Sequence, residues 1–466
     1  MKKKYLIETF GCQMNVHDSE RMAGLLDREG YEPAAGVADA DLLVINTCSV
    51  REHAEAKLYT RLGELRVLEE QTGRRPMVAV AGCVAQQEGS ALLRKTNGHV
   101  IDVVLGTQQL QALPALVASA ARSAFAEIEV GSAADATFPL GITRRGHGVK
   151  ASITIIEGCN DHCAFCVVPT TRGRERMRPK AEILAEAREA LSTGRREILL
   201  LGQIVNHYQA PDDSACDFAQ LLAEVDALPG LERLRFASPH PRHTGPRLIA
   251  ALRDLPRVCP HLHLPLQSGS TRILHAMRRR HTRDAYLALV DDVRTAVPHV
   301  ALSTDVIVGF PGETEEDFQD TLGVLERVQF QAVYSFKYST RPHTLAANRM
   351  PDDVSETEKT TRIVRLQDLQ RDIQLARHRR MLGAVVSVLV DSSSRRRAWE
   401  LSGRTAGNTV VNFPVPADSV EQSPERWLGR SVDVMIVNVG PNSVSGVVAP
   451  EGQGTFGPVE ARGTRC

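Results

Sequence analysis

Short apolar runs that alternate with helical segments dominate two long stretches of this 466-residue chain. In the first stretch the runs are YLIETFGC, DLLVINTC and MVAVAGC. Between the first two, residues 18–29 place Met22, Leu25 and Leu26 on one helical face, and Gly30 follows as a helix stop. Strand, helix and strand in repetition predict an α/β fold whose amino-terminal part is a doubly wound parallel sheet.

The second stretch carries six more apolar runs of the same kind. They are ASITIIEGC, REILLLGQ, LERLRFASP, HLHLPLQSG, ALSTDVIVGFPG and QAVYSFKYST, and segments such as KAEILAEAREALSTG separate most of them. Six βα units predict a partial or complete (βα) barrel, whose functional face lies at the carboxyl ends of the strands.

The last part of the chain changes to short β-rich runs broken by Gly, Asn and Pro, which predict a small antiparallel β-barrel. Residues 361–400, which lead into it, hold nine arginines and four acidic residues, whereas the whole chain has a net charge of zero. An acidic partner such as RNA must therefore meet a local basic patch. The predicted divisions are the sheet at 1–120, a linker at 121–145, the central barrel at 146–375, the small barrel at 378–448 and a disordered tail at 449–466.

The apolar run in MKKKYLIETFGC is too short for a signal peptide, and nothing approaches the ~18 consecutive apolar residues of a membrane span. We therefore expect a cytoplasmic protein without a membrane partner. Because thiols stay reduced in the cytosol, nine unevenly spaced cysteines favour metal binding or redox chemistry over a disulfide framework.

Three cysteines end the three apolar runs of the first stretch: Cys12, Cys48 and Cys83, here called the first triplet. In open α/β sheets the ligand crevice lies outside the carboxyl ends of the strands, so cysteines far apart in sequence can converge there. The alternative is that one of them is an ordinary buried cysteine.

Three more cysteines lie in EGCNDHCAFC, directly after the first predicted barrel strand: Cys159, Cys163 and Cys166, here called the second triplet. Thiolates at this spacing bind zinc or an iron–sulfur cluster. A structural zinc needs four ligands, and the nearest further candidate, His162, lies inside the loop between two of the cysteines. Three thiolates on a four-iron cluster leave one iron open, where a substrate can bind.

A strand followed by Cys-x3-Cys-x-aromatic-Cys, with Phe165 as the aromatic residue, resembles the radical S-adenosyl-L-methionine (SAM) superfamily. With the first triplet, the chain resembles the methylthiotransferases over nearly its whole length. The motifs are TFGCQMNVHDSE, INTCSVREHAEAK, AGCVAQQEG, EGCNDHCAFCVVPTTRGRERMRP, LLGQIVNHY, RFASPHP, HLPLQSGS, STDVIVGFPGETEEDF and GRTAGNTVVNF. The resemblance implies a central radical SAM barrel with a 4Fe–4S cluster on the second triplet, an auxiliary 4Fe–4S cluster on the first, and a carboxyl-terminal TRAM domain, an RNA-binding module.

The implied activity is a tRNA-processing transferase that uses SAM twice. One SAM methylates a sulfur on the auxiliary cluster, and reduction of a second gives a 5′-deoxyadenosyl radical that removes hydrogen from carbon 2 of an adenine. The stretch GCQMN followed by DSE is similar to family members that act on N(6)-(dimethylallyl)adenosine at position 37 of tRNA, in the anticodon loop.

Several alternatives remain open at this point. Within the family they are threonylcarbamoyl-adenosine of tRNA or an aspartate of a ribosomal protein as the substrate. In another class, the protein would be a non-catalytic iron–sulfur protein for RNA binding or electron transfer. The family implies tRNA, an electron donor such as flavodoxin or ferredoxin, and iron–sulfur assembly proteins as partners, and we expect a monomer.

Candidate SAM contacts are polar residues at the ends of later barrel strands, where they lie within reach of the cofactor. They are Gln203, Asn206, Gln267, Ser268, and the segment from Asp305 to Gly309. Each of these residues can instead serve a turn or the rim of the barrel.

Candidate RNA contacts are arginines that would meet phosphates and a tryptophan that would stack a base. They are Arg395, Arg396, Arg397 and Trp399, with Arg404 and Asn408 from the family's barrel motif. The alternatives are a solvated charged loop for the first four and a role in turns for the last two. The run from Arg278 to Arg280 is expected to be the exposed continuation of a barrel helix, with tRNA contact there as a further possibility.

Two positions depart from the family pattern. Ile204 stands where asparagine is usual, and His343 stands where glycine is usual. Neither is a predicted cluster ligand. Cys216, Cys259 and Cys466 have no partner at metal spacing and are interpreted as ordinary cysteines.

Overall fold

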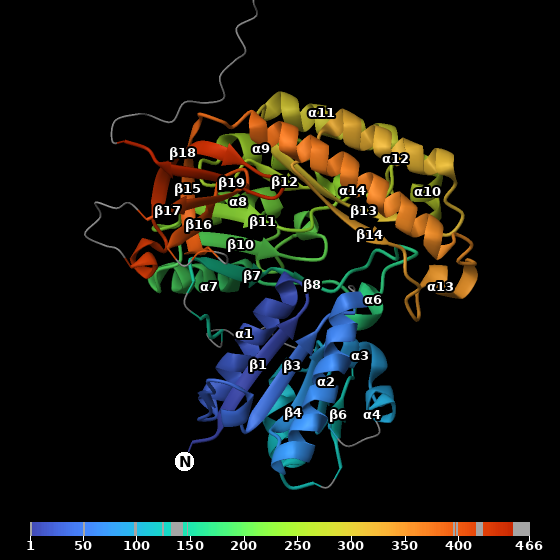
Figure 1. The fold of residues 1–466 in the computed structure, drawn as a ribbon, viewed down its shortest axis with the longest axis vertical. Helices are drawn as coiled ribbons and strands as arrows, with labels where there is room; N and C mark the ends of the chain where they lie inside the picture. Colours follow the sequence, from blue (N-terminus) through green and yellow to red (C-terminus); the bar gives the residue numbers. More distant parts are fainter. Residues whose placement is uncertain are drawn as a thin grey trace, which may run out of the picture.

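A computed structural model describes residues 2–49, 52–96, 100–123, 125–131, 143–146, 148–394, 397, 399–415 and 423–450. Figure 1 shows the amino-terminal part, in blue and cyan, as one body that lies against a larger body in green to red. Residues 451–466, most of the predicted tail, lie outside the described residues, as do Arg395, Arg396 and much of the predicted linker.

The amino-terminal body is built on a six-stranded parallel sheet with the order β2-β1-β3-β4-β5-β6. Apolar residues of β3 alternate between its faces, since Leu43 and Ile45 pack on one side and Leu42 and Val44 on the other. Helices cover both faces, which confirms the predicted parallel sheet. The strands are β1 (Lys4–Phe10), β2 (Glu32–Pro33), β3 (Leu42–Thr47), β4 (Met77–Gly82), β5 (Val103–Leu105) and β6 (Glu127–Glu129), and the helices are α1 (Gln13–Arg28), α2 (Glu52–Thr72), α3 (Cys83–Glu88), α4 (Ala91–Lys95) and α5 (Leu113–Ala120).

The strand order reverses direction beside β1, because the chain adds β2 on one side of β1 and β3 on the other. Such a switch point is where open α/β sheets bind ligands, outside the carboxyl ends of the strands. In Figure 1 these ends of β1 and β3 point toward the larger body.

The central part contains the six predicted parallel strands in two three-stranded sheets, β11-β10-β7 and β12-β13-β14. A parallel bridge between Leu234 and Val258 joins the sheets, so the six strands form one curved series. In the described part of the chain its end strands, β7 and β14, are not paired with each other, which makes this an open barrel.

The central strands are β7 (Lys150–Thr154), β10 (Glu197–Leu201), β11 (Arg233–Phe236), β12 (His261–His263), β13 (Ala301–Val308) and β14 (Ala332–Lys337), with a hairpin of β8 (Ile156–Glu157) and β9 (Arg176–Met177). The helices are α6 (Val168–Thr171), α7 (Lys180–Ser192), α8 (Phe218–Asp226), α9 (Pro246–Asp254), α10 (Thr271–Ala276), α11 (Arg283–Ala296), α12 (Glu315–Val328), α13 (Leu345–Arg349) and α14 (Glu356–Arg379).

The carboxyl-terminal part is a closed barrel with the order β15-β16-β17-β19-β18. The prediction of an antiparallel barrel is wrong for one pair, because β17 and β19 run parallel while the other four pairs are antiparallel. A closed ring with an odd number of strands cannot alternate direction throughout, so one parallel pair is unavoidable. The strands are β15 (Val385–Ser393), β16 (Glu400–Arg404), β17 (Val410–Pro414), β18 (Ser431–Val439) and β19 (Val444–Val448).

The turn formed by residues 404–409 of this barrel docks on the amino-terminal ends of the central strands. Arg235 of β11 donates to the carbonyl groups of Thr405 and Ala406, each at 2.8 Å, and Arg233 donates to that of Arg404. Gln331, just before β14, donates to the hydroxyl of Thr409 at 2.9 Å. The small barrel therefore lies opposite the carboxyl ends of the central strands.

Candidate functional site

The first triplet converges at the switch point of the amino-terminal sheet. Cys12 directly precedes α1, Cys48 follows β3, and Cys83 begins α3 after β4. The thiol of Cys48 lies within hydrogen-bonding reach of those of Cys12 and Cys83. The structure thus brings together three cysteines that are separated by 36 and 35 positions in sequence.

Two glycines allow this close approach. A Cβ atom on Gly11 would lie 2.8 Å from the Cβ of Cys48, and one on Gly82 would lie 2.5 Å from the carbonyl oxygen of Thr47. Gly82 also has a φ of +93°, in the region that favours glycine. The glycine before each of two cysteines is therefore required by the packing of the triplet.

A buried amide network anchors α1 beside the triplet. The side chain of Asn15 donates to the Oδ1 of Asn46 at 2.9 Å, and Asn46 donates to the carbonyl oxygen of Asn15 at 2.8 Å and to the hydroxyl of Ser19 at 2.9 Å. The thiol of Cys12 donates to the Oδ1 of Asn15 at 3.1 Å. Asn15 and Ser19 thus have a structural reason for their places in GCQMNVHDSE.

The electrostatics of the first triplet favour thiolates at two of its positions. Hydrogen bonds with Cys48 are the largest cause that lowers the pKa of Cys12 and of Cys83, and the guanidinium of Arg172 lowers both pKa values further. The same hydrogen bonds raise the pKa of Cys48, and burial adds to that rise. Three thiols in contact beside a buried cation suit a cluster that binds all three as thiolates.

The second triplet lies in the loop between β8 and α6. The amide of Cys166 donates to the carbonyl oxygen of Cys163 at 3.1 Å, and that of Cys159 donates to Gly173 at 3.1 Å. Gly158 has a φ of +73°, and a Cβ atom there would lie 2.2 Å from the carbonyl oxygen of Arg174. The loop therefore folds back tightly on the residues that follow α6.

Burial is the main influence on the pKa of two cysteines of the second triplet. It raises the pKa of Cys159 to about 11 and that of Cys166 to about 12. Metal coordination supplies the positive charge that buried thiolates need, so these residues also fit an iron–sulfur cluster. Among the described residues no group of three or more His, Cys, Asp or Glu side chains is placed to hold a single metal ion. In a four-iron cluster each cysteine binds its own iron atom.

Three residues outside the predicted site contact the second triplet or its loop. Ile204, one of the two departures from the family pattern, is buried and packs against Cys159, Val168 and Cys166. Arg279 donates to the sulfur of Cys163 at 3.5 Å. The Nε2 of His240 lies 4.0 Å from the carboxylate of Asp161, and burial lowers the pKa of His240 to about 2, so its imidazole is neutral.

The segment that carries the second triplet packs on the amino-terminal body, because the short helix α6 lies beside α3, the helix that begins with Cys83 (Figure 1). The second triplet ends just before α6. Arg172, just after it, donates to Asp18 of α1 at 2.7 Å and influences both Cys12 and Cys83. Met14 of α1 packs beside Cys12 against Leu199 and Leu201 of β10.

A buried polar network holds the same boundary farther along α1. His17 of α1 lies 3.3 Å from the carboxylate of Glu186 on α7 and 2.8 Å from the hydroxyl of Thr154. Arg145 and Arg178 also bind Glu186. Burial opposes ionisation of Glu186, but the hydrogen bond with His17 and the two arginines outweigh it and lower its pKa.

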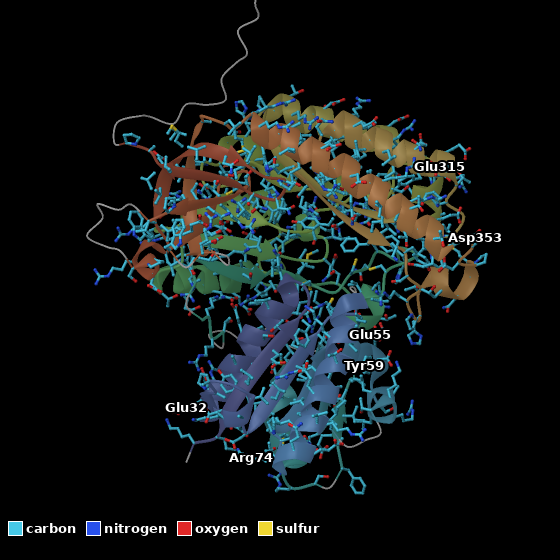
Figure 2. All side chains as sticks on the ribbon, viewed as in Figure 1. Glu32, Glu55, Tyr59, Arg74, Glu315 and Asp353 are labelled. Carbon is cyan, nitrogen blue, oxygen red and sulfur yellow. The ribbon has the colours of Figure 1, made fainter. Side chains whose placement is uncertain are left out.

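An ion pair marks the boundary on the side of α2. Figure 2 shows Glu55 of α2 near the larger body, where its carboxylate lies 3.8 Å from the guanidinium of Arg341. Contacts on α1, α2 and α6 therefore fix one body against the other.

Two of the candidate SAM contacts lie in the same loop as Ile204, which packs against the second triplet. The side chain of Gln203 donates to the sulfur of Met14. The amide of Asn206 exchanges hydrogen bonds with the backbone of His240 and donates to Thr244. Asn206 therefore orders the loop that carries His240, and His240 in turn faces the cysteine loop.

The other candidate SAM contacts have local partners. Gln267 has a φ of +72° and pairs through its backbone with β13, and the hydroxyl of buried Ser268 accepts from the amide of Ser270 at 3.2 Å. The carboxylate of Asp305 lies 3.1 Å from the Nε2 of His263. Gly309 has a φ of +70°, and its amide donates to Glu313 at 2.6 Å.

The candidate RNA contacts lie on the small barrel. Trp399 is exposed, with the guanidinium of Arg397 5.5 Å from its ring centroid, and Arg397 also pairs with Glu400 at 2.8 Å. Arg404 donates to the side chain of Asn408 at 3.2 Å, in the turn that docks on the central strands. Nothing is described for Arg395 and Arg396.

The interpretation of the arginine run as exposed is wrong for its middle residue. Arg278 and Arg280 are exposed, but Arg279 is buried against Cys163. Arg278 has a φ of +57° and ends the helical geometry of α10, so the chain turns and Arg279 points inward. The sequence predicted that the helix continues through the run, so the contact between Arg279 and Cys163 was not predicted.

The second departure from the family pattern has a backbone explanation. His343 has a φ of +66°, in the left-handed region that glycine adopts without strain. Its side chain is exposed. The imidazole therefore occupies a turn position whose geometry favours glycine.

Sequence analysis missed Arg172, Asp18, His240 and Arg279. Arg172 lies in TTRGRERMRP, six positions after Cys166, and Asp18 lies in the DSE stretch, so both were inside quoted motifs without an assigned role. A cation shortly after a cysteine cluster was the available signal for Arg172. No spacing links it to Asp18, because their contact forms only when the two bodies pack.

Two family models match the chain. Residues 4–106 match the model described as Uncharacterized protein family UPF0004, and residues 153–325 match the Radical SAM superfamily. Similar curated proteins include the tRNA-2-methylthio-N(6)-dimethylallyladenosine synthase of Geobacter metallireducens, which is 44% identical over 96% of this chain and 99% of the relative. The enzyme of the same name from Acetivibrio thermocellus is 44% identical over 96% of this chain and 91% of the relative. That of a Thermoanaerobacter species is 43% identical over 88% and 86%.

Two solved structures share the fold at low identity. The radical S-adenosylmethionine methyltransferase TsrM from Kitasatospora setae, with cobalamin and a [4Fe–4S] cluster bound, has a TM-score of 0.53 at 15% identity over 74% of each chain. The cobalamin-dependent S-adenosylmethionine radical enzyme OxsB has a TM-score of 0.51 at 10% identity over 80% of this chain and 62% of that one. No helix among the described residues is long and apolar enough to cross a membrane.

Proposed function

Since this chain belongs to the family of the tRNA-2-methylthio-N(6)-dimethylallyladenosine synthases, we propose that it adds a methylthio group to carbon 2 of N(6)-(dimethylallyl)adenosine at position 37 of tRNA. It is a radical SAM methylthiotransferase that uses 4Fe–4S clusters and SAM. The structural observation that supports the assignment is the convergence of the first triplet at the boundary where α6, the helix that follows the second triplet, packs on the amino-terminal body.

The first triplet would hold the auxiliary cluster and the second triplet the radical SAM cluster. When bound, the clusters and SAM supply the sulfur, the methyl group and the radical, which acid–base side chains cannot provide for an unactivated aromatic C–H bond. The protein binds both clusters as thiolates, keeps them on opposite sides of one boundary, and excludes water with apolar neighbours such as Met14 and Ile204.

The SAM site would lie beside the loop of the second triplet. Arg279 and His240 line that loop, and the Nε of Arg279 is buried without a hydrogen-bond partner in the described structure. A donor of this kind suits an anionic group of a ligand. Gln203 and Asn206 would act there with them, while Gln267, Ser268, Asp305 and Gly309 would shape the barrel rim.

The small barrel would act as a TRAM domain that binds tRNA, with Arg397 and Trp399 on its exposed surface and Arg395 and Arg396 close by in sequence. Arg404 and Asn408 would support this surface through their turn. A base in the anticodon loop needs little energy to leave its stack, which helps it reach a cofactor between the two bodies. An electron donor such as flavodoxin or ferredoxin, iron–sulfur assembly proteins, a monomeric state and the cytoplasm complete the proposal.

The test is an anaerobic assay of the reconstituted protein with reductant, SAM and tRNA that carries N(6)-(dimethylallyl)adenosine. We expect 5′-deoxyadenosine and a 2-methylthio nucleoside by mass spectrometry of the digested tRNA. Alanine variants of either triplet should give no methylthio product, whereas the matched control Cys216→Ser, a buried cysteine outside both triplets, should keep it.

Three results would contradict the proposal. Clusters without SAM cleavage would indicate a non-catalytic iron–sulfur protein. SAM cleavage with product only from threonylcarbamoyl-adenosine tRNA, or only on a ribosomal protein, would assign the other substrates of the family.

A further inference from the structure

Arg172 is a buried cation beside the first triplet, in the segment that follows the second triplet. Its side chain follows α6, which is a single turn long, and Cys166 of the second triplet lies just before that turn. Arg172 is only 4% exposed, and its guanidinium donates to the carboxylate of Asp18 at 2.7 Å. One short segment thus carries a ligand of the second triplet at one end and a charge directed toward the first triplet at the other.

The amino-terminal body also holds the backbone of this segment. The hydroxyl of Thr107 donates to the carbonyl oxygen of Thr171, and the side chain of Gln108 donates to that of Arg172 at 2.9 Å. Gly173 leaves room for Gln108, because a Cβ atom there would lie 2.0 Å from its Nε2. The end of α6 is therefore fixed to the body of the first triplet independently of the ion pair.

The carboxylate of Asp18 does not fully neutralise the charge of Arg172. The carboxylate of Asp18 also lies 3.8 Å from the guanidinium of Arg21. Burial disfavours a charged Arg172, but the charges of Asp18, Cys83 and Cys12 raise its pKa well above the usual value. A guanidinium stays protonated in proteins, so a positive charge is always present beside the first triplet.

We propose that Arg172 is a positioning residue of the auxiliary cluster, which offsets the negative charge of the first triplet and fixes its place relative to the second. This inference rests on the proposed auxiliary cluster. Reduction adds one negative charge to a cluster, and a nearby cation in a site of low dielectric constant stabilises the reduced form. Arg172 therefore raises the reduction potential of the auxiliary cluster.

The test measures that potential in a protein in which the second triplet is replaced by alanine, so that only the auxiliary cluster remains. Potentiometric titration followed by electron paramagnetic resonance compares Arg172→Gln and Arg172→Lys with this parent. We expect Arg172→Gln to lower the reduced-to-oxidised ratio at a fixed potential about tenfold or more, a shift of ~59 mV for a one-electron couple. Arg172→Lys keeps the charge and should restore most of the ratio.

Two further variants separate the charge from a loss of folding. Asp18→Asn combined with Arg172→Gln leaves no unpaired buried carboxylate, and its ratio should fall about tenfold or more relative to Asp18→Asn alone. Arg235→Gln removes another buried arginine, one that pairs with Glu197 and binds turn 404–409 on the side opposite the carboxyl ends of the central strands, and it should leave the potential unchanged.

The possible failures are distinguishable. If the parent holds no cluster on the first triplet, the proposed function fails and this inference fails with it. If the cluster is present but Arg172→Gln has the potential of the parent, and the double variant has that of Asp18→Asn, only the role of Arg172 is overturned. A shift in Arg172→Lys as large as that in Arg172→Gln would also overturn it, because the charge would then not be the cause.

Discussion

Replacing Gly82 by alanine should remove the auxiliary cluster while the radical SAM cluster stays. Gly82 has a φ of +93° and a ψ of −160°, a region that only glycine adopts without strain, and another residue there costs about 1–3 kcal/mol. The new Cβ would also lie 2.4 Å from the Oδ1 of Asn46 and 2.5 Å from the carbonyl oxygen of Thr47. Overpacking of this kind costs about 1–3 kcal/mol more, so the total is about 2–6 kcal/mol.

Gly73 provides a matched control for this variant. It has a φ of +69°, but a Cβ atom there would have no neighbour within 4 Å, so Gly73→Ala carries strain of about 1–2 kcal/mol without a clash. After anaerobic reconstitution we expect about eight irons per chain in Gly73→Ala and about four in Gly82→Ala, which should also unfold at lower denaturant. The reasoning is refuted if Gly82→Ala keeps the iron content and stability of Gly73→Ala.

Two other variants test the electrostatics and packing of the larger body. Burial raises the pKa of Glu313 to about 7, although the amide of Gly309 and the guanidinium of Arg362 favour its carboxylate. Because the pKa of Glu313 is raised in the folded state, its contribution to stability is complete below pH ~4.5 and is lost as the pH rises through about 7. Glu313→Gln removes this titration, so it should flatten the decline in melting temperature between pH 5 and 8. An unchanged pH profile would reject this. Arg235→Met should loosen the docking of turn 404–409, since each hydrogen bond from a charged donor contributes about 1.5–3 kcal/mol. Limited proteolysis should then release the small barrel sooner than in the unmodified protein. Equal cleavage rates would contradict this prediction.

Local pattern was enough to predict β1, β3 and β4, the six central strands and the strand ends that carry the first triplet. The run DLLVINTC is apolar on both faces because β3 is buried by helices on both sides, and such a run indicates an inner parallel strand. The sequence therefore placed Cys48 at a carboxyl end beside its neighbours. The closed small barrel was predicted from its turns, but its one parallel pair follows from strand number and closure, which no single run reveals.

Contacts between the two bodies could not be predicted from the sequence. Arg172 and Asp18 are 154 positions apart, and His17 and Glu186 are 169 positions apart. Neither pair has a periodicity or motif that joins it. The direction of Arg279 was missed for a different reason, because its inward turn depends on the positive φ of Arg278, a residue type that rarely adopts it.

Counting iron and sulfide tests the two-cluster arrangement most directly. Anaerobically reconstituted protein should hold about eight irons and eight sulfides per chain, and replacement of either triplet by alanine should leave about four of each, with a four-iron signature in the Mössbauer spectrum. About four irons in the unmodified protein, or zinc in place of iron, would contradict the assignment of one cluster to each triplet.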